Sequence, residues 1–276
     1  ASIGFMNKVQ GILLVVAVLL VVAIYSLPKV VVNNESTEQA AFIDETIPGG
    51  IVDHSTEIPE EVQPRIAFWK DRLLSNGRIQ PNIESLDSLM AVFMEINKYD
   101  SAAYYAALYA EELDQISLWQ KAGDAYFEAF TFALDKPKID FLGGKAREIY
   151  QKILEEQSDN YDVKHNVAMT YVSSSNPMQG IMMLREILEQ DPDNQRTLMS
   201  MGRMSIQTSQ FENAVERFET YVRYYPQDVE GNFFLGVCYY EIGQLVKAKA
   251  QFDKVKELGA DEQIITAADE YLERIS

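Results

Sequence analysis

Residues 195–228 read QRTLMSMGRMSIQTSQFENAVERFETYVRYYPQD and carry the main architectural signal of the chain. Apolar residues recur along this stretch at the three- and four-residue spacing of an amphipathic helix. Pro226 follows the last apolar run, and proline ends a helix because it has no backbone N–H to continue the hydrogen-bond ladder. The stretch therefore predicts a helical unit that closes at Pro226.

The same pattern recurs on both sides of this stretch with a period of 34 residues. Four kinds of position keep the register: a small residue, a large apolar residue, a proline and a tyrosine. They are Ala168, Gly202 and Gly236; Leu184, Phe218 and Phe252; Pro192 and Pro226; and Tyr171 and Tyr239. Four columns in one register are difficult to obtain by chance, so the chain contains internal repeats.

Two of these columns have a direct packing explanation. A small residue such as Gly202 suits the place where the first helix of a unit crosses the second, because a longer side chain there would hold the helices apart. A large apolar residue such as Phe218 fills the space between one unit and the next. The columns therefore predict paired helices that stack on each other.

With these columns the chain resembles the tetratricopeptide repeat (TPR) family over residues 116–262. The residues that carry the resemblance are Val167, Ala168, Tyr171, Gly180, Leu184, Ile187 and Pro192; Leu198, Met201, Gly202, Ala214, Phe218, Tyr221 and Pro226; and Leu235, Gly236, Tyr239, Ala248, Phe252 and Val255. Ala260 stands where proline is usual. The resemblance implies an all-α, TPR-type solenoid of helical hairpins with units 116–160, 161–194, 195–228 and 229–262. It specifies the fold and not the ligand.

The first unit, 116–160, is longer than the family pattern. Trp119, Ala122, Gly123 and Tyr126 fit a first helix, and Ala146, Tyr150 and Ile153 fit a second. The excess is residues 134–144, which form either a loop insertion or an extension of one helix. Insertions in helical repeats fall between helices, so this segment is a candidate contact loop.

Further helices are expected on both sides of the repeats. Residues 58–115 are expected to form N-terminal, TPR-like helices, the first of which ends at Asn76-Gly77. A helix pair follows at 82–115, with an apolar stripe along each helix and Asp100 as the cap of the second helix. The first stripe comprises Ile83, Leu86, Met90, Phe93 and Met94; the second comprises Ala103, Tyr104, Tyr105, Ala107 and Leu108. Residues 263–276 form a C-terminal helix that caps the last unit.

The N-terminal part of the chain has a different character. Residues 9–32 contain the run GILLVVAVLLVVAIYSL at 11–27 and no charge between Lys8 and Lys29, which predicts a transmembrane anchor. A cleaved signal peptide is the alternative, but Tyr25-Ser26-Leu27 is a poor cleavage site. Residues 33–57 form an acidic flexible linker. Because no Lys or Arg lies between Lys29 and Arg65, we expect the C-terminal part on the translocated side, which in a bacterium is the periplasm.

Composition excludes several classes of function. The formal net charge is -18, from 42 acidic and 24 basic residues, so the chain lacks the surplus of cations that nucleic-acid binding needs. The sequence has no phosphate-binding loop, metal-ligand spacing or nucleophile motif, and its two histidines lie in different regions. We therefore expect no enzyme activity, no cofactor and no metal. Cys238, the single cysteine, is expected to be a core residue.

The candidate functional surface is the face lined by the first helix of each unit. Helical spacing places eight residues on it as a partner-binding groove: His165, Met169, Arg196, Met199, Arg203, Phe233, Val237 and Tyr240. Such a surface is apolar and aromatic with a local pair of arginines in an acidic protein. It suits a protein segment with apolar anchors and an acidic group.

These features predict a membrane-anchored protein–protein interaction scaffold. The layout of one N-terminal helix followed by TPR-like repeats is similar to that of YfgM-type ancillary subunits of the Sec translocon. That similarity implies a periplasmic chaperone-like or assembly factor of an export machine in the bacterial inner membrane. The alternative is a fixed structural subunit of a respiratory, cytochrome-maturation or motility complex.

Overall fold

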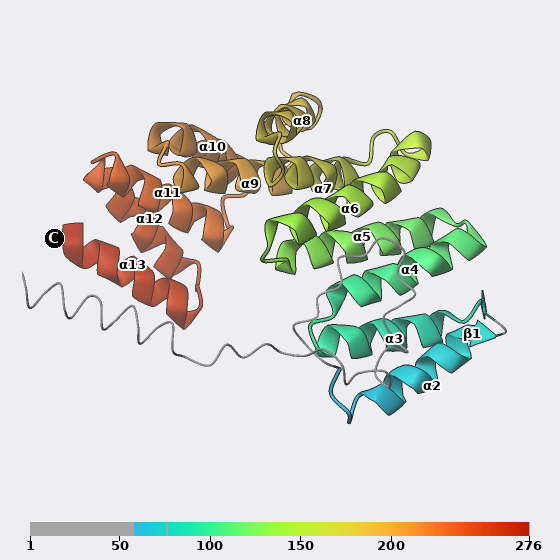
Figure 1. The fold of residues 1–276 in the computed structure, drawn as a ribbon. Helices are drawn as coiled ribbons and strands as arrows, with labels where there is room; N and C mark the ends of the chain where they lie inside the picture. Colours follow the sequence, from blue (N-terminus) through green and yellow to red (C-terminus); the bar gives the residue numbers. More distant parts are fainter. Residues whose placement is uncertain (1–57, 76, 276) are drawn as a thin grey trace, which may run out of the picture. The chain divides into compact units, whose positions relative to one another are not determined.

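The computed structural model describes residues 58–75 and 77–275. Its elements, labelled as in Figure 1, are α2 Gln63–Leu73, β1 Leu74–Ser75, β2 Arg78–Ile79, α3 Ile83–Glu95, α4 Tyr99–Leu113, α5 Ile116–Phe132, α6 Lys136–Glu156, α7 Tyr161–Val172, α8 Pro177–Gln190, α9 Gln195–Gln207, α10 Phe211–Tyr224, α11 Val229–Glu241, α12 Leu245–Glu257 and α13 Glu262–Ile275.

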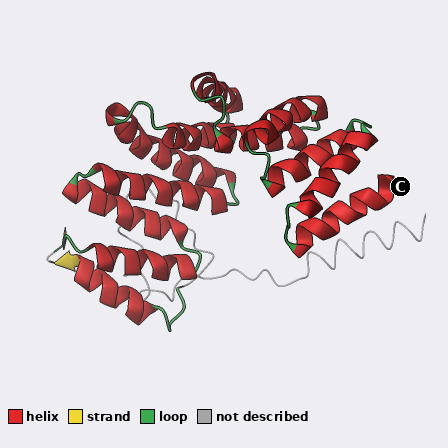
Figure 2. Cartoon of the chain, turned by 180° about the vertical axis from the view of Figure 1, so that it is seen from behind, coloured by secondary structure: helices red, strands yellow, loops and turns green. Residues whose placement is uncertain are grey.

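Successive helices pack on each other in chain order and form a TPR-like array of hairpins, as Figures 1 and 2 show. The predicted units correspond to the pairs α5/α6, α7/α8, α9/α10 and α11/α12. Two short strands are the exception to the all-α prediction: Leu74 pairs with Ile79 and Ser75 with Arg78. They flank the expected stop after α2, where Gly77 has a φ of 74°, a value that favours glycine.

The crossing of the two helices in a unit explains the small and large columns together. A Cβ added to Gly202 would lie 2.6 Å from Cζ of Phe218, and one added to Gly236 would lie 2.8 Å from Cε1 of Phe252. The aromatic ring therefore packs on the glycine of its own unit. In α7/α8 the equivalent residues are Ala168 and Leu184, and both are fully buried. Alanine is larger than the glycine of the other two units, and leucine is smaller than their phenylalanine.

A further 34-residue column marks the start of the first helices. Asn160, Asn194 and Asp228 are the N-cap residues of α7, α9 and α11. The side chain of each accepts a hydrogen bond from a backbone N–H three residues later, at 3.1, 3.0 and 2.7 Å respectively. Each cap satisfies one N–H that the helix itself leaves unpaired.

The excess residues of the first unit lengthen α6, so the loop alternative for 134–144 is wrong. Asp135 is the N-cap and accepts a hydrogen bond from Lys138 N–H at 2.9 Å, so the helix begins at Lys136. Nζ of Lys136 donates to the carbonyl of Ser173 at 2.9 Å, which ties the extension to the end of α7.

Two details of the N-terminal pair correct the sequence interpretation. The N-cap of α4 is Lys98, and Asp100 lies inside the first turn. In α3 the residues that the fold buries are Ser85, Leu86, Leu89, Val92 and Phe93. Ile83, predicted to belong to the buried stripe, is exposed because it is the first residue of the helix.

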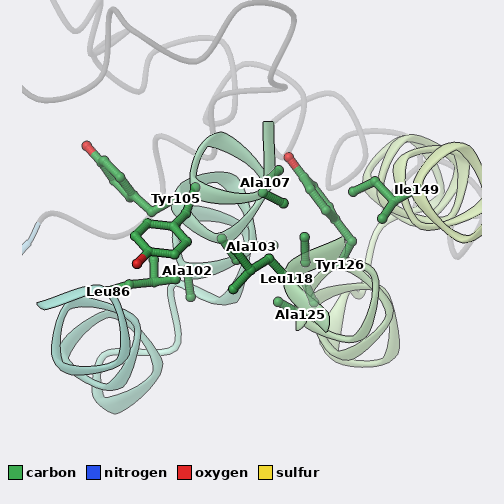
Figure 3. Close-up of a cluster of buried hydrophobic side chains, with 14 of the residues drawn as sticks. Leu86, Ala102, Ala103, Tyr105, Ala107, Leu118, Ala125, Tyr126 and Ile149 are labelled. Atoms are coloured by element: carbon green, nitrogen blue, oxygen red, sulfur yellow. The ribbon is translucent and has the colours of Figure 1, made fainter. Parts of the chain in front are cut away.

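The buried apolar side chains fall into three clusters. The first runs from α2 to α7, and Figure 3 shows a part of it. The last runs from α9 to α13. The middle cluster contains only Ala168, Leu184, Ile187 and Met201. Helices α8 and α9 make few contacts with each other compared with the other consecutive helices, so the array is most thinly packed here.

The C-terminal helix α13 packs on α12 and α11 of the last unit. Its Ala268 is fully buried, and the ring of Tyr271 stacks on Phe252 at 4.9 Å. The predicted anchor 9–32 and linker 33–57 lie outside the described residues. Among those that are described, no helix combines the length and the apolar character needed to cross a membrane.

Candidate functional site

Charged side chains join successive first helices across the array. Lys121 on α5 pairs with Asp87 on α3 at 2.8 Å, and Arg196 on α9 pairs with Asp162 on α7 at 3.3 Å. The two residues of each pair are 34 positions apart. The α3/α4 pair is thus in register with the repeats, although its sequence departs from the family pattern.

A polar network continues inward from Arg196. Its Nη2 donates to Oδ1 of Asn166 at 2.8 Å, and Nδ2 of Asn166 donates to the Tyr150 hydroxyl at 2.9 Å. That hydroxyl donates to Oδ1 of Asp124 at 2.7 Å. Burial, and then the charge of Asp124, raise the pKa of Tyr150 well above its usual range, so the hydroxyl keeps its proton. Four helices, α5, α6, α7 and α9, are linked in this way.

His165 is part of the same polar region and is buried, with 5% of its surface exposed. Its Nε2 lies 3.0 Å from Oγ of Ser200 on α9. Burial, followed by the charge of Arg196, lowers the pKa of His165 to about 4. The ring is therefore neutral at pH 7 and positions α7 against α9, where an open ligand position had been expected.

Acidification is expected to weaken the fold through His165. Its folded-state pKa lies below the unfolded value of 6.5, so the unfolded chain binds the proton more readily and stability falls as the pH drops from about 6.5 towards 4. Between pH 7.5 and pH 5 this group alone removes about 2 kcal/mol from the free energy of unfolding. Urea unfolding at a series of pH values, followed by circular dichroism, measures the change.

His165→Gln is the matched variant for that measurement. It retains a side chain that can hydrogen-bond Ser200, but it does not titrate in this range. Its loss of stability between pH 7.5 and pH 5 is expected to be smaller than that of the parent by the same amount, about 2 kcal/mol. Identical pH dependences in the two proteins would contradict the role assigned to His165.

The second predicted arginine, Arg203, is also held by a neighbouring first helix. Its Nη1 donates to Oε1 of Glu230 on α11 at 3.3 Å, and its guanidinium carbon lies 5.5 Å from the ring centre of Phe234. The side chains of Arg196 and Arg203 remain 48% and 60% exposed. Both arginines are therefore positioned by an acid and still accessible to a partner.

The remaining predicted residues are partly buried and divide between two environments. Met169 and Met199 pack at the edges of the middle and last clusters. Phe233 and Tyr240 lie 6.3 and 5.1 Å from Tyr271 of α13, measured between ring centres. Val237 packs in the same cluster. The structure thus places His165 and Arg196 in one polar region between α7 and α9. It places Phe233 and Tyr240 next to Tyr271 of the capping helix.

Sequence reasoning missed the polar partners that hold these residues. They are Asp124, Tyr150, Asp162, Asn166, Ser200 and Glu230. The 34-residue offset between Asp162 and Arg196 was a signal that could have revealed one pair. The others join different columns of the repeat, so the period alone does not identify them.

Cys238 is fully buried in α11, and burial raises the pKa of its thiol to about 12. This placement agrees with a core role. In residues 58–75 and 77–275, no three His, Cys, Asp or Glu side chains are grouped so that they could hold a metal ion.

Comparison with known proteins finds similarity in structure and no match in sequence. No protein-family profile matches the chain, and no curated protein matches it in sequence. Among solved structures, YrrB, described as a TPR protein with an unusual peptide-binding site, is 15% identical with a TM-score of 0.43, covering 68% of this chain and 92% of that one. A MamA protein is 12% identical with a TM-score of 0.45, covering 71% and 92%. MamA from Desulfovibrio magneticus RS-1, from residue 41 to its end, is 14% identical with a TM-score of 0.47, covering 65% and 96%.

Proposed function

We propose that this chain is a protein–protein interaction scaffold that binds segments of other proteins along the first helices α7, α9 and α11. The observation that carries the proposal is the state of Arg196 and Arg203. Each is fixed by polar groups of a neighbouring helix and each is about half exposed. A fixed guanidinium loses less conformational freedom on binding a carboxylate than a free one, so the surface is prepared for an acidic ligand.

Apolar side chains beside the arginines supply the second half of the proposed interaction. Met199 lies between Arg196 and Arg203 on the same helix and is partly exposed. Methionine adapts its shape to different partners because its side chain is unbranched and flexible. A segment that combines an apolar anchor with Asp or Glu fits this arrangement.

The expected test result is a loss of binding in the double variant Arg196→Glu with Arg203→Glu. Reversal of both charges is expected to weaken partner binding about tenfold or more, because the carboxylate of the ligand would meet like charges. Photo-crosslinking from position 199 of the full chain in native membranes measures the effect. Arg223→Glu, an exposed change on the second helix α10, is the matched control.

Arg196 also belongs to the buried network, so Arg203→Glu alone is needed to separate binding from folding. The Arg203–Glu230 pair is exposed and contributes at most about 1 kcal/mol to stability, which leaves the fold intact. Unchanged crosslinking in both the double variant and Arg203→Glu would rule out the first-helix surface as the binding site.

The setting proposed for this scaffold is the bacterial inner membrane, with a single pass and the described part in the periplasm. Support comes from the uncharged apolar run in 9–32 and the acidic, Lys/Arg-free segment that follows it. In that setting a chaperone-like or assembly role at an export machine, similar to that of YfgM-type subunits, accounts for the combination of anchor, tether and binding surface.

A fixed subunit of an inner-membrane complex is the second candidate. Permanent interfaces are larger and more apolar than transient ones, and so resist salt. Co-purification from membranes at low and high salt separates the two. A stoichiometric partner retained at high salt supports the fixed subunit, and several partners released by salt support the chaperone-like role.

A further inference from the structure

Helix α2 is the first helix that the structure describes, and one of its sides is uncovered by the described residues. Ile66 and Leu73 are buried on the side that packs on α3. Pro64 and Phe68 lie on the side turned away from α3, and both are exposed. The exposed fraction of Phe68 is 51%. Figures 1 and 2 both place α2 at the edge of the described helices.

The other end of the array has a different surface. No large apolar side chain of α13 is exposed. The residues of α13 on the side away from the core are polar and exposed: Gln263, Thr266, Glu270 and Glu273. The terminal helices of a repeat array need a polar outer face to remain soluble. Helix α13 meets this requirement and α2 does not, so a partner is expected to cover the outer side of α2.

Charges of opposite sign stand at the two ends of this side of α2. The N–H of Gln63 donates to the carbonyl of Pro59 at 3.3 Å, so the helical path already includes Glu61. Glu61, Phe68 and Arg72 are seven and four residues apart, a spacing that places them on one face. The guanidinium carbon of Arg72 lies 4.8 Å from the ring centre of Phe68. The face thus begins with a carboxylate, continues with an aromatic ring and ends with a cation.

This order of charges is complementary to itself. Two copies of α2 that meet antiparallel, with their midpoint between residues 66 and 67, place Glu61 of each copy opposite Arg72 of the other. The same arrangement brings Phe68 of each copy beside Pro64 of the other. A two-fold interface requires this reciprocity, because each contact must occur twice with the roles of the two copies exchanged.

Other occupants of this face fit its charges less well. Residues 33–57 contain no Lys or Arg, so this segment would add carboxylates beside Glu61 and supply no cation to it. An anionic membrane surface would attract Arg72 but would repel Glu61 and the acidic remainder of the chain. A second copy supplies an opposite charge to both ends of the face and an apolar surface to its centre.

We propose that the outer side of α2, with Glu61, Pro64, Phe68 and Arg72, is the interface of an antiparallel, two-fold dimer of this chain. One side of an 11-residue helix offers less area than the about 800 Å² per partner of a typical stable interface, so the dimer is weak and depends on concentration. The interface lies outside α7, α9 and α11, so the dimer would present two first-helix surfaces and bind a partner with two suitable segments more tightly than one copy does.

The test is crosslinking of the full chain in intact cells through Ala67→Cys, a position next to the proposed midpoint. A short bismaleimide is the reagent, and the single native thiol, Cys238, is fully buried and so protected from it. We expect a crosslinked dimer. Arg72→Glu or Glu61→Arg is expected to lower its yield about fivefold or more, because like charges would then face each other. Val246→Cys, at an 86% exposed apolar position on α12, is the matched control and is expected to give no dimer.

A charge exchange separates the interface from the stability of α2 itself. Glu61→Arg combined with Arg72→Glu should restore the yield, because the two copies again present opposite charges. Both changes oppose the helix dipole, so an effect through helix stability would make the double variant worse than either single one. Direction is tested with two differently tagged copies, one with Glu61→Cys and one with Arg72→Cys. An antiparallel dimer links these two copies to each other more than to themselves.

Four outcomes would overturn the proposal. They are the absence of a dimer from position 67, a yield that does not depend on the charges at 61 and 72, no recovery in the exchanged variant, and preferential self-linking in the tagged mixture. A thiol at position 67 that is protected from the reagent in a monomer would identify another occupant. Crosslinks from position 199 report on the first-helix surface, so failure of the dimer is distinguishable from failure of the proposed function.

Discussion

Gly202→Leu is expected to unfold the C-terminal repeats. Even a Cβ at this position would lie 2.6 Å from Cζ of Phe218, which is a distance that real side chains do not adopt. The ring cannot move away, because Phe218 is fully buried and stacks on Phe234 at 5.5 Å. Helices α9 and α10 must therefore separate, at a cost of more than about 3 kcal/mol. Circular dichroism during urea unfolding measures the loss.

Alanine variants give this prediction its controls. Gly202→Ala and Gly144→Ala gain the same helix propensity, about 1 kcal/mol, but a Cβ at Gly144 meets nothing closer than 3.8 Å. Gly144→Ala should therefore stabilise the protein, and Gly202→Ala should destabilise it. Adding Phe218→Leu to Gly202→Ala should recover part of the loss, since α7/α8 already combines Ala168 with Leu184. A parent-like melting curve for Gly202→Leu would contradict the packing described for this crossing.

Tyr150→Phe has the second-largest expected effect. The change removes one hydroxyl that donates to Asp124 and accepts from Asn166. Asn166 is buried, so its amide loses a partner and gains no water in exchange. The lost hydrogen bond to a carboxylate and the buried donor left unpaired together lower stability by about 2–3 kcal/mol. The expected result is a loss of that size in the free energy of unfolding.

Tyr171→Phe is the matched control for Tyr150→Phe. Tyr171 is partly buried, and its contact with Arg147 runs through the ring and is retained in phenylalanine. The control is expected to change stability by less than about 0.5 kcal/mol. Equal effects of the two substitutions would show that the network through Tyr150 does not stabilise the fold.

The sequence was sufficient to predict the hairpins because their packing is encoded once per repeat. The small and large columns fix which residues meet at each crossing, and the structure pairs Gly202 with Phe218 and Gly236 with Phe252 as these columns require. The extension of α6 could not be distinguished from a loop, since Gly143 and Gly144 lower helix propensity. Two contacts decide in favour of the helix: the local N-cap at Asp135 and the tertiary contact of Lys136 with the end of α7.

The candidate site was less predictable because exposure depends on the neighbouring helix. Helical spacing assigned His165 and Arg196 to one predicted surface, and in the structure both side chains make polar contacts between α7 and α9. The spacing could not reveal that α9 covers the imidazole or that Asn166 holds the guanidinium. Equally, Phe233 and Tyr240 contact Tyr271 of a helix that is outside the repeat period. The binding groove itself stays a prediction.

The thin packing between α8 and α9 has a mechanical consequence. A force that pulls on the two ends of the described array passes through every interface in turn, and the array yields first where the least apolar surface resists separation. That place is the middle cluster, since it has only four buried apolar side chains. Around it, polar contacts such as Arg196–Asn166 would extend and break one by one. We therefore expect the described array to respond to a load as two arms that meet at this interface, which would open before either arm unfolds.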